Sequence, residues 1–73
     1  MKVRIVGEGE LASGVQEYLT VGKVYDAEAH PAVKDLVIVK CDDGLPITVN
    51  VKNAHLCGHI SDANGDLRWE VVE

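Results

Sequence analysis

Aromatic residues are scarce in this chain, which has no phenylalanine, one tryptophan and two tyrosines among its 73 residues. Its core must therefore be built mainly from aliphatic side chains, and valine is abundant among them. The branched Cβ of valine stiffens the side chain and fits a pleated, half-buried surface, which favours strands. A chain of this length has room for one hydrophobic core. We predict a single, mainly β domain over residues 1–73.

Clustered positive charge is also missing. The chain has 7 basic and 12 acidic residues, a formal net charge of −5, and the basic residues are scattered along it. Binding to a phosphate backbone depends on grouped Lys and Arg side chains. The longest acidic run, Asp42-Asp43, is too short to imitate an array of phosphates. We therefore expect no direct contact with nucleic acid.

Long apolar stretches are absent, and none approaches the length needed to cross a membrane. The first residues are too few and too polar for the hydrophobic part of a signal peptide. Cysteine is limited to Cys41 and Cys57, and we expect two free thiols in a reducing cytoplasm. We expect a monomer with no membrane partner.

Alternation of polar and apolar residues predicts a strand at the start of the chain. Val3 and Ile5 share one face of residues 2–6, as in a half-buried strand. We expect this strand to be a sheet edge, where its main chain could pair with a partner. Residues 10–19 fit either a short helix or an irregular loop, because their apolar residues recur at helical spacing while Gly14 disfavours a helix.

Three further segments complete the middle of the predicted sheet. A strand follows the turn at Gly22 and ends at Pro31, which lacks a donor for the ladder. Residues 35–41 are a nearly unbroken apolar run, typical of a central strand covered on both faces for part of its length. Asp43-Gly44 predicts a hairpin turn before the next strand. The expected inward residues are Tyr25, Ala27 and Ala29, then Ile47, Val49 and Val51.

Two more strands are predicted near the end of the chain. Residues 55–60 alternate, with Leu56 and Ile60 facing inward, and a turn containing Asn-Gly follows at 62–66. The last strand places Leu67, Trp69 and Val71 on its inner face. Five or six short strands joined by turns predict a small SH3-like barrel or a twisted antiparallel meander.

The pattern His55-x-Cys57-x-His59 is the most suggestive chemical group. On a strand, these three side chains would share one face and could hold one metal ion, with Cys41 or His30 as a fourth ligand. Structural zinc sites more often consist of two closely spaced ligand pairs on turns, which this chain lacks. We expect a solvent-facing polar strand with no metal, and keep a small metal-binding protein as an alternative.

Catalysis is not expected. Cys57 beside a histidine meets the minimal requirement for a nucleophile and its base. Such a cysteine also needs an oxyanion hole and a concave substrate site, which a domain of this size seldom encloses. We therefore predict no catalytic residues and no cofactor, and a protein that acts by binding a partner.

Candidate contact residues come from three places: the segment before the second main strand, because loops often carry function, the first strand, and the polar face of residues 55–60. The proposed partner contacts are Lys2, Arg4, Tyr18, Leu19, His55 and His59.

Short motifs from residue 18 to residue 72 resemble those of small phage-encoded proteins with SH3-like β folds. They are Tyr18-Leu-Thr-Val-Gly-Lys-Val-Tyr25, the hairpin Asp42-Asp-Gly and the closing Arg68-Trp-Glu-Val-Val72. With its length and acidic β character, the chain resembles in particular the small phage regulators that inhibit the RNA polymerase of a bacterial host.

This resemblance implies a protein in the cytoplasm of an infected bacterium. It implies binding to the polymerase at the β′ amino-terminal region and the β flap. It further implies displacement of the σ factor, which inhibits initiation, and antitermination at terminators. An alternative of the same kind is an inhibitor of another host protein, such as a defence or restriction enzyme.

Overall fold

The computed structural model describes residues 1–60 and 64–73 of the chain. Its strands and two 3-10 turns are, in chain order, β1 (Lys2–Val6), β2 (Gly9–Glu10), η1 (Val15–Glu17), β3 (Val24–Ala29), β4 (Leu36–Lys40), β5 (Pro46–Asn50), η2 (Ala54–Leu56), β6 (Asn64–Gly65) and β7 (Arg68–Val71). The fold is mainly β, as the composition predicts.

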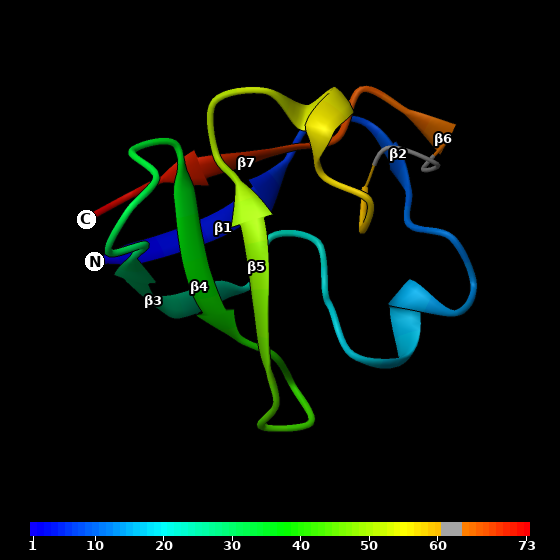
Figure 1. Cartoon of the computed structure of the whole chain (residues 1–73). Coiled ribbons are helices and arrows are strands. Elements are labelled where there is room, and N and C mark those ends of the chain that lie inside the picture. The colour runs from blue at the N-terminus through cyan, green and yellow to red at the C-terminus, as the bar shows by residue number, and fades with distance from the viewer. Residues whose placement is uncertain (61–63) are drawn as a thin grey trace.

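Five strands form one antiparallel sheet in the order β5-β4-β3-β1-β7. β3, β4 and β5 follow one another as a meander, whereas β1 lies between β3 and β7 (Figure 1). The short strands β2 and β6 pair separately. The two ends of the chain lie side by side, because the Lys2 main-chain nitrogen donates to the Glu73 carbonyl at 2.8 Å.

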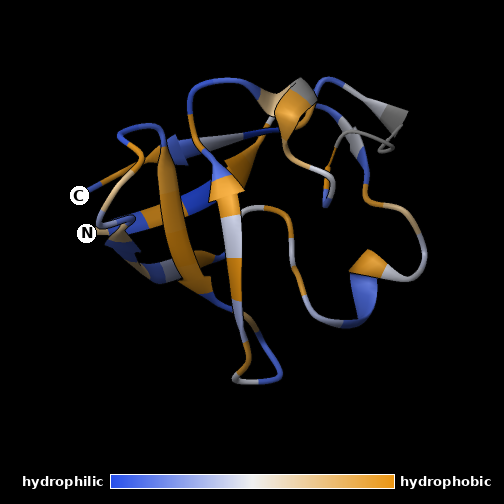
Figure 2. Ribbon diagram, viewed as in Figure 1, coloured by the Kyte–Doolittle hydropathy of each residue, from blue (hydrophilic) through white to orange (hydrophobic). Residues whose placement is uncertain are grey.

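The alternation along each strand places one face on the core. β4 is the clearest case, because Val37 and Val39 are 2% and 0% exposed while Ile38, between them, is half-buried on the other face. Figure 2 shows β4 hydrophobic along most of its length and β5 alternating. These positions confirm β4 as an interior strand.

Most of the residues predicted to face inward are buried, whereas Ile47 and Val51 are half-buried and pack against the core. Trp69 is 4% exposed and packs edge to face against Tyr25, with ring centroids 6.3 Å apart, so its position in the core is confirmed. The buried residues are Val3, Ile5, Leu11, Leu19, Tyr25, Ala27, Val37, Val39, Cys41, Val49, Cys57, Ile60, Leu67 and Trp69. Ala29 and Val71 are exposed instead, because each is the last residue of its strand.

The predicted hairpin joins β4 to β5. The Gly44 main-chain nitrogen donates to the Cys41 carbonyl at 3.0 Å, and Gly44 has a φ of +83°, a conformation that glycine adopts at no steric cost. The Asp43 carboxylate accepts a bond from the Leu45 main-chain nitrogen at 3.0 Å. A short polar side chain and a glycine thus make this turn, as the Asp-Gly pair predicts.

The prediction that residues 2–6 form a sheet edge is wrong. β1 pairs with β3 on one side and with β7 on the other. Its partner in β7 lies more than sixty residues away, for example Arg4 opposite Glu70. The edges of the sheet are therefore β5 and β7.

The prediction of a strand over residues 55–60 is also wrong. The segment forms η2 and then a second turn, in which the Ile60 main-chain nitrogen donates to the Cys57 carbonyl at 3.2 Å. Leu56, expected inward, is 70% exposed, while Cys57 and Ile60 are buried. Turns that close every three residues bring Cys57 and Ile60 to the same side, and Gly58 favours such a turn.

Residues 10–19 form an irregular loop with the single 3-10 turn η1, which settles the choice left open by their spacing. Leu11 and Leu19 are buried and Val15 packs against them. Of the turn predicted at 62–66, residues 62 and 63 lie outside the described residues, and Asn64–Gly65 form β6.

Candidate functional site

Tyr18 and His59 are far apart in the sequence and meet at the surface. The Tyr18 hydroxyl lies 3.0 Å from Nδ1 of His59, and the two rings pack edge to face with centroids 5.9 Å apart. Both side chains are half-buried, so each also presents part of its ring to solvent. The sequence nominates both as partner contacts, and the fold places them together.

Residues that flank Tyr18 in the sequence line a hollow of about 300 Å³. It is lined by β2 and by Leu11, Gln16, Leu19, Thr20 and Val21. The Gln16 side-chain nitrogen donates to the Leu11 carbonyl at 2.7 Å, which holds the loop across one side of the hollow. Tyr18 and His59 do not line this hollow, and we call these two side chains together the loop surface.

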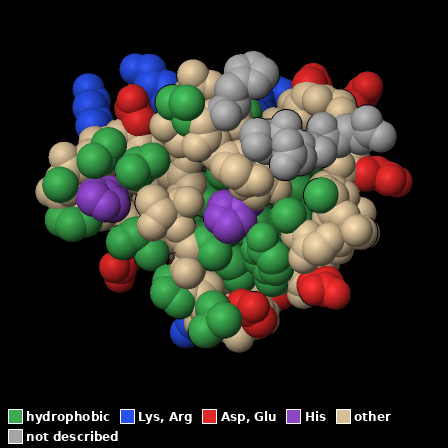
Figure 3. Space-filling view, turned by 45° about the vertical axis from the view of Figure 1, so that its right-hand side comes forward, with side chains coloured by type: hydrophobic (Ala, Val, Ile, Leu, Met, Phe, Trp, Pro, Cys, Tyr) green, Lys and Arg blue, Asp and Glu red, His purple; other side chains and the backbone are tan. Residues whose placement is uncertain are grey.

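One face of the molecule combines hydrophobic and polar side chains. Figure 3 shows a histidine near the middle of that face, with hydrophobic side chains beside it and acidic side chains toward the periphery. Hydrophobic side chains inside a polar rim are typical of protein contacts.

Main-chain bonds fix the position of Tyr18. Its nitrogen donates to the Val15 carbonyl at 3.1 Å, at the end of η1. Its carbonyl accepts a bond from the Asp42 main-chain nitrogen at 3.0 Å. The loop surface is therefore attached directly to the β4–β5 hairpin.

A network of side chains strengthens the same attachment. The Tyr25 hydroxyl accepts a bond from the Thr20 main-chain nitrogen at 2.7 Å and donates to Asp42 Oδ2 at 3.1 Å. The Thr20 hydroxyl also donates to Asp42, at 2.9 Å, and Lys23 forms an ion pair with the same carboxylate. Asp42 thus accepts three side-chain donors of the β2–β3 loop and strand β3.

Burial and hydrogen bonding shift the pKa values of Tyr25 and Asp42. Burial is the main cause of the raised pKa of Tyr25, which keeps its hydroxyl protonated and able to donate. The hydrogen bond from Lys23 is the main cause of the lowered pKa of Asp42. The network therefore joins the loop to the hairpin as a clamp.

Lys2 and Arg4 lie on the outer face of β1, opposite the buried side chains of Val3 and Ile5. Each already has a partner on a neighbouring strand, since Lys2 Nζ lies 2.8 Å from Asp26 and Arg4 Nε lies 3.0 Å from Glu70. Exposed pairs of this kind stabilise a fold only slightly. Each of the two positive charges is thus paired with a carboxylate on a neighbouring strand.

Leu19 is 2% exposed, so its side chain belongs to the core and cannot be a contact anchor. Only its neighbours in the loop reach the surface, among them Val21, which is 39% exposed. His55 lies in η2, and its side chain is outside what the structure describes.

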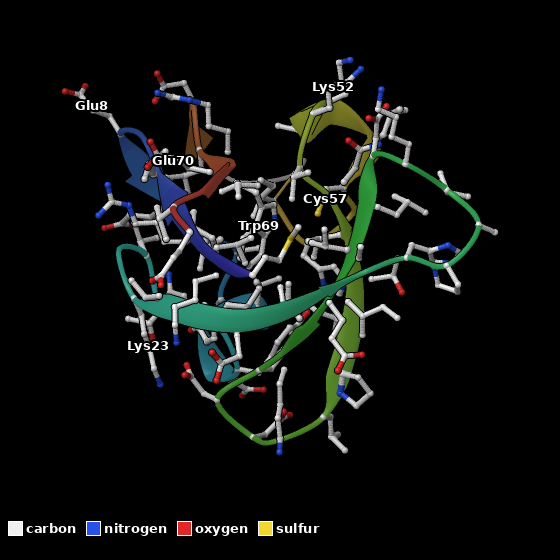
Figure 4. The ribbon with its side chains drawn as sticks, turned by 90° about the vertical axis from the view of Figure 1, so that its left-hand side faces the viewer. Glu8, Lys23, Lys52, Cys57, Trp69 and Glu70 are labelled. Carbon is white, nitrogen blue, oxygen red and sulfur yellow. The ribbon has the colours of Figure 1, made fainter. Side chains whose placement is uncertain are left out.

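Cys57 points into the core, and residues 55–60 do not form the strand on which the metal-site alternative depends. It is 2% exposed and its thiol is free, while the side chain of His59 is directed to Tyr18. Figure 4 shows Cys57 and Trp69 in the interior, whereas Lys23 points outward. Among the side chains that the structure describes, which do not include that of His55, no group of three His, Cys, Asp or Glu could hold a metal ion.

Thr20, Val21 and Asp42 are residues of this region that the sequence did not single out as part of a site. In the sequence, Asp42 looks like a residue of the turn at Asp43-Gly44. No local pattern indicates that its carboxylate also binds Tyr25 and Lys23. The nearest sequence signal is the Leu-Thr-Val-Gly-Lys-Val-Tyr run itself. It contains the three residues whose side chains bond to Asp42, which are Thr20, Lys23 and Tyr25, and it contains Leu19 and Val21 of the hollow.

Comparisons with protein-family models, with curated proteins and with solved structures find no match to this chain. Among the described residues, no helix is both long and apolar enough to span a membrane.

Proposed function

We propose that this chain is a phage-encoded regulator that binds the RNA polymerase of its bacterial host in the host cytoplasm. In this proposal it contacts the β′ amino-terminal region and the β flap, displaces the σ factor to inhibit initiation, and promotes antitermination. The proposal of the partner is supported by the motifs between residues 18 and 72 that resemble phage regulators of this kind.

The observation that carries a binding role is the contact between Tyr18 and His59. The Tyr18 hydroxyl lies 3.0 Å from Nδ1 of His59, the Tyr18 main chain is anchored to the hairpin through Asp42, and the residues that follow Tyr18 in the loop line a hollow. Tyrosine is enriched among the residues that dominate binding energy, because a large ring and a hydroxyl need few rotatable bonds. We assign the loop surface as the contact with the partner.

Capture from a bacterial lysate tests the proposed partner. The tagged chain and an unrelated acidic β domain are used as baits, and bound proteins are identified by mass spectrometry. We expect the polymerase β′ and β subunits to be enriched over the control bait, with σ depleted relative to them. Equal recovery with both baits contradicts the proposal, and enrichment of a nuclease would instead indicate an inhibitor of a defence or restriction enzyme.

Binding to purified polymerase tests the assigned surface. We expect Tyr18→Ala and His59→Ala each to weaken binding at least about tenfold, the size of a hot-spot residue. Val33→Ala is the matched control, since Val33 is 46% exposed but lies in the β3–β4 connection. Near-ultraviolet circular dichroism, which reports on the packing of Trp69 in the core, checks that each variant is folded. Wild-type affinity in both folded variants would show that the contact lies elsewhere.

A further inference from the structure

We propose that the free edge of β5 binds an extended, basic segment of a partner protein as an added strand. This inference does not depend on the identity of the partner or on the loop surface. It rests on where the main-chain groups of β5 point, on how exposed they are, and on the charges beside them.

The direction of the main-chain groups in β5 follows from its pairing with β4. The Val51 nitrogen donates to the Asp35 carbonyl at 3.1 Å, and the Leu45 carbonyl accepts from the Cys41 nitrogen at 3.0 Å. Alternate residues of an antiparallel strand direct their N–H and C=O groups to opposite sides. The odd-numbered residues from 45 to 51 therefore face β4.

The even-numbered residues face the free edge. Thr48 and Asn50 present both N–H and C=O there, and Pro46 presents its carbonyl alone. Within the described part of the chain, none of these main-chain groups has a main-chain partner on that side. Thr48 is exposed and Asn50 is half-buried, so a partner strand can reach them.

The other edge of the sheet, β7, is buried at its centre, where a partner strand would have to pair. The Val72 nitrogen donates to the Lys2 carbonyl at 2.9 Å, so the alternating Trp69 and Val71 are the residues of β7 that face away from β1. Trp69 is only 4% exposed, main chain included, so an extended segment cannot lie along β7. β5 is the edge available for strand addition.

The outer face beside β5 holds a hollow of about 350 Å³. Ile38 and Pro46 contribute apolar surface to it, and Asp26, Glu28 and Lys40 contribute charge. The register places Glu28, Ile38 and Thr48 in one row across β3, β4 and β5. A long side chain from an added strand would pass over Thr48 and reach Ile38.

Charge indicates which side chain this would be. Asp26 is paired with Lys2, whereas Glu28 and Lys40 form no ion pair with any described residue, and Lys40 lies in the row of Pro46, not in the row of Thr48. A Lys or Arg side chain opposite Thr48 would lay its methylene groups on Thr48 and place its charge over Ile38, on the side of Glu28. The segment that fits is therefore extended, with a basic residue opposite Thr48 on the outer face.

Selection from a library of random dodecapeptides on the immobilised chain tests this inference. We expect enriched peptides to be able to form an extended strand and to share a Lys or Arg at one position. Thr48→Pro removes the outward N–H without touching the bonds to β4, and should weaken their binding about tenfold. Val71→Pro makes the same change on the buried edge, β7, and should leave binding unchanged. Glu28→Gln should weaken binding severalfold and reduce its salt dependence.

Amide NMR of the wild-type chain gives a result that does not depend on the variants folding. On addition of an enriched peptide, the Thr48 and Asn50 amides should shift and exchange more slowly with solvent, while the Val71 amide should not. The inference is overturned if no peptide is enriched, if the shifts lie outside β5, or if a folded Thr48→Pro chain binds like the wild type.

Discussion

The Tyr25 hydroxyl lies 2.7 Å from the Thr20 main-chain nitrogen and 3.1 Å from Asp42 Oδ2, so one phenol joins the β2–β3 loop to the β4–β5 hairpin. Its ring is buried against Trp69 and its hydroxyl reaches the edge of the core. The Asp42 main chain also holds the Tyr18 carbonyl. The network that stabilises the fold therefore also positions the proposed contact residue.

Removing the Tyr25 hydroxyl should destabilise the protein. Tyr25→Phe keeps the ring in the core but leaves the Thr20 nitrogen without its acceptor and Asp42 without one donor. We expect a loss of about 1–2 kcal/mol in the free energy of unfolding, measured by urea denaturation. Tyr18→Phe is the control, because its hydroxyl is only half-buried and water can replace the bond to His59. An equal or larger loss in Tyr18→Phe would contradict this assignment.

The Asp42 clamp should make stability depend on pH. Hydrogen bonds, chiefly the one from Lys23, lower the pKa of Asp42 in the folded state below its value in the unfolded chain. The folded state therefore binds fewer protons, and this contribution is complete above the unfolded pKa of about 3.9 and is lost as pH falls through the lower folded pKa.

Thermal melting between about pH 6 and pH 2 measures this dependence. We expect the melting temperature of the wild type to fall more steeply on acidification than that of Asp42→Asn, which does not titrate. Parallel curves for the two proteins would show that Asp42 contributes nothing to the acid sensitivity.

Gly65 should tolerate no side chain. It has a φ of +116°, and a Cβ at this position would lie 2.1 Å from the Glu8 carbonyl oxygen across the β2–β6 pair. We expect Gly65→Ala to cost several kcal/mol in stability or to separate β2 from β6, because both the conformation and the space are unavailable.

Gly14→Ala provides the matched comparison for Gly65→Ala. Gly14 has φ −68° and ψ −31°, and no atom lies within 4 Å of the Cβ that alanine would add. We expect a stability within about 1 kcal/mol of the wild type, or slightly above it. Chemical denaturation measures the free energy of unfolding of the two variants. Similar losses of stability in both would show that the effect of Gly65→Ala is not steric.

The two thiols should report on the opening of the core. Cys41 and Cys57 are free and are 6% and 2% exposed, and burial raises the pKa of Cys41. Since the thiolate is the reactive form, we expect labelling by an aromatic disulfide reagent to be slow in native buffer and fast in urea. Single-cysteine variants, Cys41→Ala and Cys57→Ala, separate the two rates. Rapid labelling of either thiol in the folded protein would contradict its placement in the core.

Local patterns predict the strands of this fold well where one face is buried. Val3 and Ile5, Val37 and Val39 are buried as expected, and the Asp-Gly turn lies where its chemistry places it. The pattern fails at residues 55–60, because apolar residues four apart fit a pair of tight turns as well as a strand. The difference depends on Cys57, which the core takes in place of Leu56.

The candidate site is less predictable. Tyr18 and His59 are nominated one by one from the sequence, but nothing local indicates that they touch, and Leu19 looks as accessible as its neighbour. Likewise Glu28, Ile38 and Thr48 form a row only because three strands pair in one register. Contacts of this kind come from packing between distant segments.

The sequence by itself determined the β class, most strand positions, the buried face of each main strand and the β4–β5 turn. These depend on the alternation of side chains along a strand and on the conformations that glycine allows, which are properties of neighbouring residues. Only the tertiary structure decided that β1 is interior, that β5 is the accessible edge, and that Asp42 and Tyr25 anchor the loop carrying Tyr18. Each of these depends on hydrogen bonds and packing between residues that the chain brings together only when it folds.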